Sequence, residues 1–99
     1  MEHVILGIDI GGTSIKGAVL VQGKLQDIRS IPTPAGESQE YILETIATFI
    51  DSYSAYDFVG IGIGIPGLVD ARRGLVLGLA NIPSFQQVPL KKFLEDRFG

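Results

Sequence analysis

The stretch LGIDIGGTSIKG, residues 6–17, decides the fold of this 99-residue chain. The run at 4–10 is short, apolar and mostly β-branched, which predicts a strand buried on both faces. Gly11 and Gly12 predict a turn, and the run at 15–21 predicts a second strand. We therefore expect a glycine-rich hairpin. The P-loop pattern is excluded, because Ala18 stands where that motif needs lysine.

Outward from this hairpin, the sequence predicts a meander followed by a helix. Residues 22–24 predict a tight turn, and residues 25–31 a third strand. Apolar side chains then recur every three or four residues from Ser38 to Tyr53, the period of an amphipathic helix. Ser38 is its expected N-cap.

The second half of the chain predicts a parallel crossover. In the strand expected at 58–65, glycine alternates with isoleucine, so one face lacks side chains. Such a face predicts close packing of a backbone, a helix or a ligand. A short strand at 75–77 and a helix over 89–98 follow. The whole pattern predicts an α/β fold: a mixed sheet with a three-strand meander and helices.

Composition excludes several kinds of site. The chain has no cysteine, one histidine and a net charge of −3. Disulfides, thiolate metal sites and histidine-cluster metal sites are therefore excluded, and the charge argues against nucleic-acid binding. No apolar run approaches the roughly 18 residues of a membrane span, and we expect no signal peptide, because a strand-like run begins at Val4. We expect a cytoplasmic protein that binds neither nucleic acid nor membrane.

The first hairpin could bind an anion such as a nucleotide phosphate. Turn N–H groups at a glycine pair face outward, hydroxyl groups add donors, and lysine adds positive charge. A carboxylate at the strand end could hold a hydrated Mg²⁺. An ordinary glycine-rich hairpin is the alternative. The candidate residues are Asp9, Gly11, Gly12, Thr13, Ser14 and Lys16.

Two later loops could recognise a polar ligand such as a sugar. The GIGIPG motif at 62–67 matches a dinucleotide-binding pattern but leads into a loop instead of a helix. Its last residue, Gly67, exposes backbone, and Asn81 both donates and accepts hydrogen bonds. Ordinary turn chemistry is the alternative for both. Asp70 lies in a solvent-facing turn, where the raised pKa of a general base is not expected.

Taken together, residues 6–17, 60–70 and 79–90 resemble three motifs of the ROK family of sugar kinases. The resemblance spans essentially the whole chain, with the motifs in order and at natural spacing. It implies an actin-like, ribonuclease-H-like ATPase fold of two lobes, with ATP and sugar in the cleft between them. Residues 1–99 would be the N-terminal lobe, and the C-terminal lobe would be absent from this chain.

The resemblance also implies roles for the phosphate-binding residues. Asp9 would face the Mg²⁺–ATP phosphates, holding the metal through water. Gly11, Gly12 and Thr13 would form the phosphate hairpin, with Lys16 in support.

The resemblance also implies which residues contact the sugar, and that the catalytic base lies outside this chain. Gly67 and Asn81 would touch the sugar. Ser14 stands where many members carry lysine or asparagine. The aspartate that acts as catalytic base, and a structural zinc motif, would lie downstream, so no catalytic residue is expected within 1–99.

The expected activity of the longer protein is glucokinase-like transfer of the ATP γ-phosphoryl group to a hexose hydroxyl. Kinases of N-acetylmannosamine or N-acetylglucosamine are alternatives, and so is a sugar-responsive transcriptional regulator of the same family. We expect the longer protein to be a homo-oligomer. Residues 1–99 alone should be inactive and prone to self-association, because missing strands would leave a sheet edge exposed.

Overall fold

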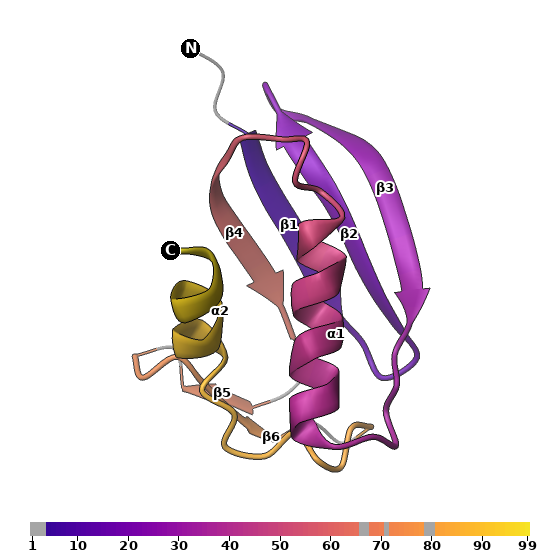
Figure 1. Cartoon of the computed structure of the whole chain (residues 1–99), viewed down its shortest axis with the longest axis vertical. Helices are drawn as coiled ribbons and strands as arrows, with labels where there is room; N and C mark the ends of the chain where they lie inside the picture. Colours follow the sequence, from indigo (N-terminus) through magenta and orange to yellow (C-terminus); the bar gives the residue numbers. More distant parts are fainter. Residues whose placement is uncertain (1–3, 66–67, 71, 79–80) are drawn as a thin grey trace.

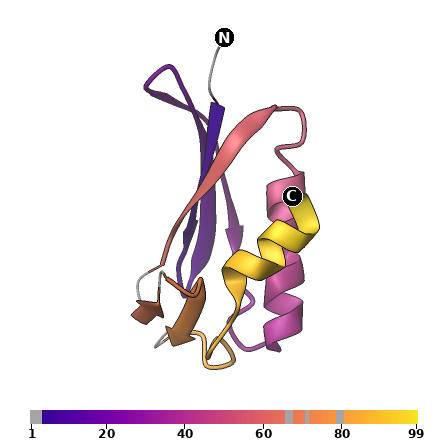
Figure 2. The ribbon, with the colours of Figure 1, turned by 90° about the vertical axis from the view of Figure 1, so that its left-hand side faces the viewer.

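Two helices cover one face of a four-stranded sheet in the computed structural model of the chain (Figure 1, Figure 2). The structure describes residues 4–65, 68–70, 72–78 and 81–99. The elements are β1 (Val4–Ile10), β2 (Ser14–Val21), β3 (Lys24–Pro32), α1 (Gln39–Asp51), β4 (Phe58–Gly64), β5 (Leu68–Asp70), β6 (Leu75–Gly78) and α2 (Leu90–Phe98). The sheet has the order β3-β2-β1-β4, and β5 pairs with β6 in a separate small sheet.

The predicted meander and crossover are both confirmed. β1 and β2 are antiparallel, as are β2 and β3, and β4 runs parallel to β1. Gln22 and Gly23 have φ values of 51° and 79°, as a type I′ hairpin turn requires. Because β1 and β4 are parallel, their carboxyl ends lie at the same edge of the sheet, the lower edge in Figure 1.

Helix α1 forms where the apolar period predicted it. The Ser38 hydroxyl accepts a hydrogen bond from the Tyr41 N–H at 3.2 Å, which confirms the N-cap. The helix ends at Asp51, two residues before the buried Tyr53 that closes the predicted pattern. Its apolar face joins the inward face of the sheet in one core, so α1 fixes the position of β1 beneath it. The buried α1 residues are Ile42, Leu43, Ile46, Ala47, Phe49 and Ile50.

The expectation that β1 is buried on both faces is wrong for the structure described. Leu6, Ile8 and Ile10 are buried, but Ile5 is 40% exposed and Asp9 faces outward. The physical reason is that both helices lie on the same side of the sheet (Figure 2). The described residues therefore leave the other face of the sheet uncovered.

The expected close packing on the glycine face of β4 is also not found among the described residues. A Cβ placed on Gly60 or Gly62 would meet no atom within 4 Å. At Gly64 it would lie 3.7 Å from Oδ1 of Asp9. The glycines thus leave the outer face of β4 open and, at its carboxyl end, leave room beside Asp9.

The last third of the chain forms the small sheet and α2. The β6 strand confirms the short strand predicted at 75–77, whereas the pairing of β5 with β6 was not foreseen. Pro89 is the N-cap of α2, so the helix begins one residue later than expected. Gly99, with φ of 83°, caps its end. Neither described helix is long and apolar enough to cross a membrane.

Candidate functional site

The glycine-rich hairpin between β1 and β2 presents backbone donors at the edge of the sheet. The Gly11 N–H donates to the Ser14 carbonyl at 3.0 Å and closes the turn. The N–H groups of Gly12 and Thr13 donate to no backbone carbonyl of the described residues. Two such N–H groups in a glycine turn can bind an anion. The described geometry is therefore compatible with the predicted phosphate hairpin.

Asp9 and Lys16 lie opposite each other beside this turn. They are Cα partners in the β1–β2 register, so their side chains share one face of the sheet. Both are exposed, and neither forms an ion pair with a described residue. On the other side Asp9 is paired with Gly64, whose missing side chain leaves the carboxylate uncovered. A carboxylate and an ammonium group thus flank the hairpin on its open face.

Asn81 packs against the hairpin. A Cβ built on Gly12 would overlap the Cβ of Asn81 and would come within 3.2 Å of its Cγ and 3.3 Å of its Nδ2. Gly12 therefore does more than turn the chain, because its missing side chain admits Asn81. The residue predicted to touch a sugar and the turn predicted to bind phosphate are in direct contact.

Buried neighbours hold Asn81 in this place. Ile82 follows it directly and is fully buried, as are Phe85 and Val88. Val88 is tied to Val76 of β6 by two backbone hydrogen bonds of 2.8 Å. The segment that carries Asn81 is thus anchored in the core while the Asn81 side chain stays exposed.

Three hydrogen bonds between this segment and the start of α1 also hold it, one of them from the Gln39 side-chain amide to the Gln86 carbonyl at 3.2 Å. The Gln39 side-chain amide donates to the Ser84 carbonyl at 3.2 Å. The Ser84 hydroxyl donates to the Glu37 carbonyl at 2.8 Å. The start of α1 therefore positions Asn81 indirectly, through the segment that follows it.

Thr33 is a site residue that the sequence did not identify. It directly follows β3, and it forms hydrogen bonds to the hairpin carbonyls of Gly11 and Thr13. The sequence signal at this position was only the Pro-Thr-Pro at 32–34, which predicts a break in regular structure.

The donor set at the hairpin fits a metal carried by a nucleotide. Within the described ranges, no three His, Cys, Asp or Glu side chains come together. Mg²⁺ in nucleotide sites keeps several waters and needs only one or two carboxylates besides the phosphate oxygens. The exposed Asp9 carboxylate could supply one such ligand, directly or through water.

Two further positions came from the sequence, Gly67 and Asp70. Gly67 lies outside the described residues. Asp70 accepts hydrogen bonds from the Arg73 side chain at 2.7 Å and the Arg73 N–H at 3.2 Å. These bonds lower the pKa of Asp70 below its ordinary value, which is the opposite of what a general base needs. The expectation that the pKa of Asp70 is not raised is thus supported, but the expected solvent-facing turn is wrong, because Asp70 ends β5 and its side chain is only 27% exposed.

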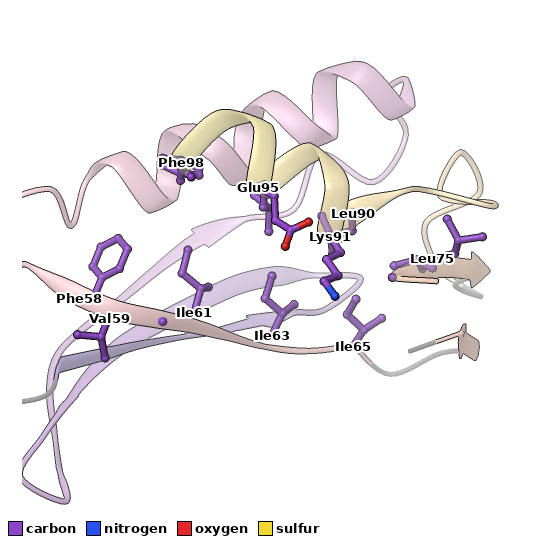
Figure 3. Close-up of a pocket in the computed structure, with 15 residues that line it drawn as sticks. Phe58, Val59, Ile61, Ile63, Ile65, Leu75, Leu90, Lys91, Glu95 and Phe98 are labelled. Atoms are coloured by element: carbon purple, nitrogen blue, oxygen red, sulfur yellow. The ribbon is translucent and has the colours of Figure 1, made fainter. Parts of the chain in front are cut away.

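An apolar groove of about 490 Å³ lies between β4 and α2 (Figure 3). Ile61, Ile63 and Ile65 point into it from β4 and the residue beyond its end, and Leu90 and Leu94 line it from α2. Among the described residues that line it, the charged ones, Lys91 and Glu95, belong to α2. The groove does not include the hairpin residues or Asn81, so the candidate chemistry lies outside it.

Comparison with known proteins identifies the family. The family model described as ROK matches residues 5–99. A Caldicellulosiruptor sp. protein named as a xylose repressor is 36% identical over 97% of the chain, which covers 26% of that protein. A glucokinase of Halalkalibacterium halodurans is 35% identical over 92% of the chain and 29% of its own length. An N-acetyl-D-glucosamine kinase of Vibrio atlanticus is 36% identical over 94% of the chain and 31% of its own length.

A solved structure agrees with these relatives. The ROK family glucokinase of Streptomyces griseus, in complex with glucose and AMPPNP, superposes with a TM-score of 0.82 at 32% identity. The match covers 97% of this chain and 30% of the glucokinase. This chain spans less than a third of the length of the relatives it matches, and its α/β fold is that of the actin-like ATPases. The chain belongs to the ROK family.

Proposed function

We propose that residues 1–99 form the N-terminal lobe of an ATP-dependent hexose kinase with glucokinase-like activity. The observation that carries this proposal is the contact between Gly12 and Asn81. This contact supports the proposal, because a turn that binds phosphate and a side chain that binds sugar would have to lie side by side for phosphoryl transfer. The relatives are about three times as long as this chain, so the aspartate that acts as base would belong to the rest of the polypeptide.

In this proposal the hairpin binds the phosphates of ATP. The N–H groups of Gly12 and Thr13 would donate to phosphate oxygens, and the Thr13 and Ser14 hydroxyls would add donors. Lys16 would add positive charge on the same face. Asp9 would hold a hydrated Mg²⁺, and the bound ion would neutralise part of the negative charge of the phosphates. Positioning and charge stabilisation of this kind supply most of the catalysis in phosphoryl transfer.

Asn81 would orient the sugar beside that hairpin. Its side-chain amide can donate to one hydroxyl and accept from another. Its backbone is held by buried neighbours, so a bound sugar would meet a fixed amide instead of a mobile one. Gly67 would contact the sugar as well.

Phosphorylation of N-acetylglucosamine is the main alternative to phosphorylation of glucose. The N-acetyl-D-glucosamine kinase of V. atlanticus is as similar to this chain as the glucokinase is. A panel of glucose, N-acetylglucosamine and N-acetylmannosamine, measured as kcat/KM in the full-length protein, separates the two activities. We expect glucose to give the highest value.

A regulator is the other candidate, favoured by the relative named as a xylose repressor. The two candidate functions differ in whether the protein consumes ATP. A kinase consumes ATP in the presence of its sugar, whereas a regulator without kinase activity would bind sugar with no turnover.

Substitution of Asp9 tests the proposal. In the full-length protein, Asp9→Ala should abolish sugar-dependent ATP consumption, while glucose binding measured by calorimetry survives. Asp70→Ala is the matched control, because that carboxylate ends β5 and is paired with Arg73, and the variant should keep its turnover. An active Asp9→Ala enzyme would refute the role of Asp9. Sugar-dependent turnover by residues 1–99 alone would refute the lobe assignment.

A further inference from the structure

Thr33 forms hydrogen bonds to both ends of the hairpin turn. Its hydroxyl donates to the Gly11 carbonyl at 2.7 Å, and its N–H donates to the Thr13 carbonyl at 2.9 Å. The two carbonyls flank Gly12. One residue at the end of β3 therefore fixes the backbone on both sides of the turn.

The hydroxyl bond fixes the direction of one particular N–H. A trans peptide unit is planar, so the carbonyl of one residue and the N–H of the next point in opposite directions. Holding the Gly11 carbonyl toward Thr33 thus turns the Gly12 N–H away from Thr33. The Gly12 N–H is one of the two hairpin N–H groups that donate to no backbone carbonyl of the described residues.

Thr33 is itself held in place. Pro32 and Pro34 flank it, and proline restricts both its own φ and the residue before it to extended conformations. Thr33 is half-buried. Little conformational freedom is therefore lost when its two hydrogen bonds form.

We infer that Thr33 is a positioning residue that aims the Gly12 N–H at a phosphate oxygen of the nucleotide. This inference rests on the proposed function of the hairpin. Thr33 does not touch the phosphate. It acts through the Gly11–Gly12 peptide, so its hydroxyl should matter for phosphate affinity more than for the stability of the fold.

The test is a titration of the full-length protein with Mg²⁺–AMPPNP, followed through the amide NMR signals of Gly12 and Thr13. Thr33→Val removes the hydroxyl but keeps the shape and the backbone N–H, and Thr33→Ser restores the hydroxyl. The matched control is Thr45→Val, because the Thr45 hydroxyl also donates to a carbonyl, that of Tyr41 at 2.8 Å, but within α1.

We expect Thr33→Val to shift the free Gly12 amide signal and to weaken binding about three- to tenfold, the range for loss of one hydrogen bond. Thr33→Ser should bind within about twofold of the native chain, and Thr45→Val should bind as the native chain does. Melting measured alongside should show that all variants fold.

Three results would overturn the inference while the proposed function stands. The first is a Thr33→Val variant that binds Mg²⁺–AMPPNP with the native affinity. The second is a Thr33→Ser variant whose affinity is as low as that of Thr33→Val. The third is a Thr33→Val variant that does not fold, because the hydroxyl would then be required for the fold itself. A native chain whose Gly12 and Thr13 amides do not respond to Mg²⁺–AMPPNP would instead contradict the proposed phosphate hairpin, and the inference would fall with it.

Discussion

Asn81 occupies the space that a side chain on Gly12 would need: a Cβ there would overlap the Asn81 Cβ and lie 3.2 Å from its Cγ. The contact joins two segments that are far apart in the sequence. Because Ile82 is fully buried, Asn81 cannot retreat without disturbing the core. Any side chain at position 12 must therefore displace either the hairpin or the proposed sugar-binding residue.

The first prediction concerns Gly12→Ala. A displacement of the hairpin by about 1 Å spoils N–H···O geometry, so Mg²⁺–AMPPNP should bind the variant about tenfold more weakly or worse. Titration of the full-length protein measures this. Gly36→Ala is the control, because a Cβ at Gly36 meets no atom within 4 Å. Equal affinities of the two variants would contradict the role given to the contact.

The second prediction concerns the packing of β2 against α1. A Cβ on Gly17 would lie 2.8 Å from Cε2 of Phe49 and 3.1 Å from Cε2 of Tyr53. Gly17→Ala should therefore lower the free energy of unfolding by about 1–3 kcal/mol, the usual cost of overpacking. Urea denaturation measures the difference.

The control for Gly17→Ala is Gly7→Ala on the neighbouring strand. There the nearest atom to an added Cβ is the Ala18 carbonyl oxygen at 3.8 Å, an ordinary contact. Because alanine costs less backbone entropy than glycine, Gly7→Ala should be neutral or slightly stabilising. A loss of stability at Gly7 as large as that at Gly17 would show that the packing against α1 is not the cause.

The third prediction is a loss of stability in acid that depends on Asp27. Its carboxylate accepts hydrogen bonds from Arg29, at 2.8 and 2.9 Å, and from the Tyr56 hydroxyl at 2.9 Å. The bonds from Arg29, then that from Tyr56, hold the pKa of Asp27 below its ordinary value of 3.8. A depressed pKa in the folded chain stabilises the fold above the unfolded pKa, and this contribution is lost as pH falls through the folded value.

Asp27→Asn tests this contribution. Asparagine tolerates the positive φ of 52° at this position but has no charge to lose. On lowering the pH from about 6 to about 2.5, the melting temperature should fall less in Asp27→Asn than in the native chain. Asp96→Asn on the exposed face of α2 is the control. If the melting temperature of Asp27→Asn falls as much as that of the native chain, the Asp27 carboxylate does not contribute to the loss of stability in acid.

The elements of the main sheet and α1 could be predicted because their signals are local. The apolar period from Ser38 to Tyr53 and the turn at Gln22 and Gly23 each need only neighbouring residues to be interpreted. The hairpin at Gly11 and Gly12 was predictable as a turn for the same reason. Its proposed ligand, however, came from the resemblance to a family.

The features that could not be predicted depend on contacts between distant segments. Nothing near Thr33 in the sequence indicates that its hydroxyl donates to the Gly11 carbonyl. Nothing near Asn81 indicates that its side chain contacts Gly12. The alternating glycines of β4 showed that one face lacks side chains. They could not show that the described residues leave this face open, because that depends on where both helices lie.

The last prediction is self-association of the 99-residue chain through the edge of β4. The opposite edge of the sheet, β3, contains Asp27 and Arg29. Charged side chains of this kind protect an edge against pairing. In contrast, β4 reads FVGIGIG and has no charged residue. A second copy can therefore add its own β4 to this edge.

A lysine in the middle of β4 should block that pairing. Gly62→Lys places the charge where an added Cβ meets no atom within 4 Å, and Gly36→Lys adds the same charge at an equally open position in a loop. In sedimentation velocity over a concentration series, the native chain and Gly36→Lys should form dimers, whereas Gly62→Lys should stay monomeric. A native chain that stays monomeric throughout contradicts the prediction. Dimers that persist in Gly62→Lys would place the contact elsewhere, because like charges brought together across the paired edges repel each other.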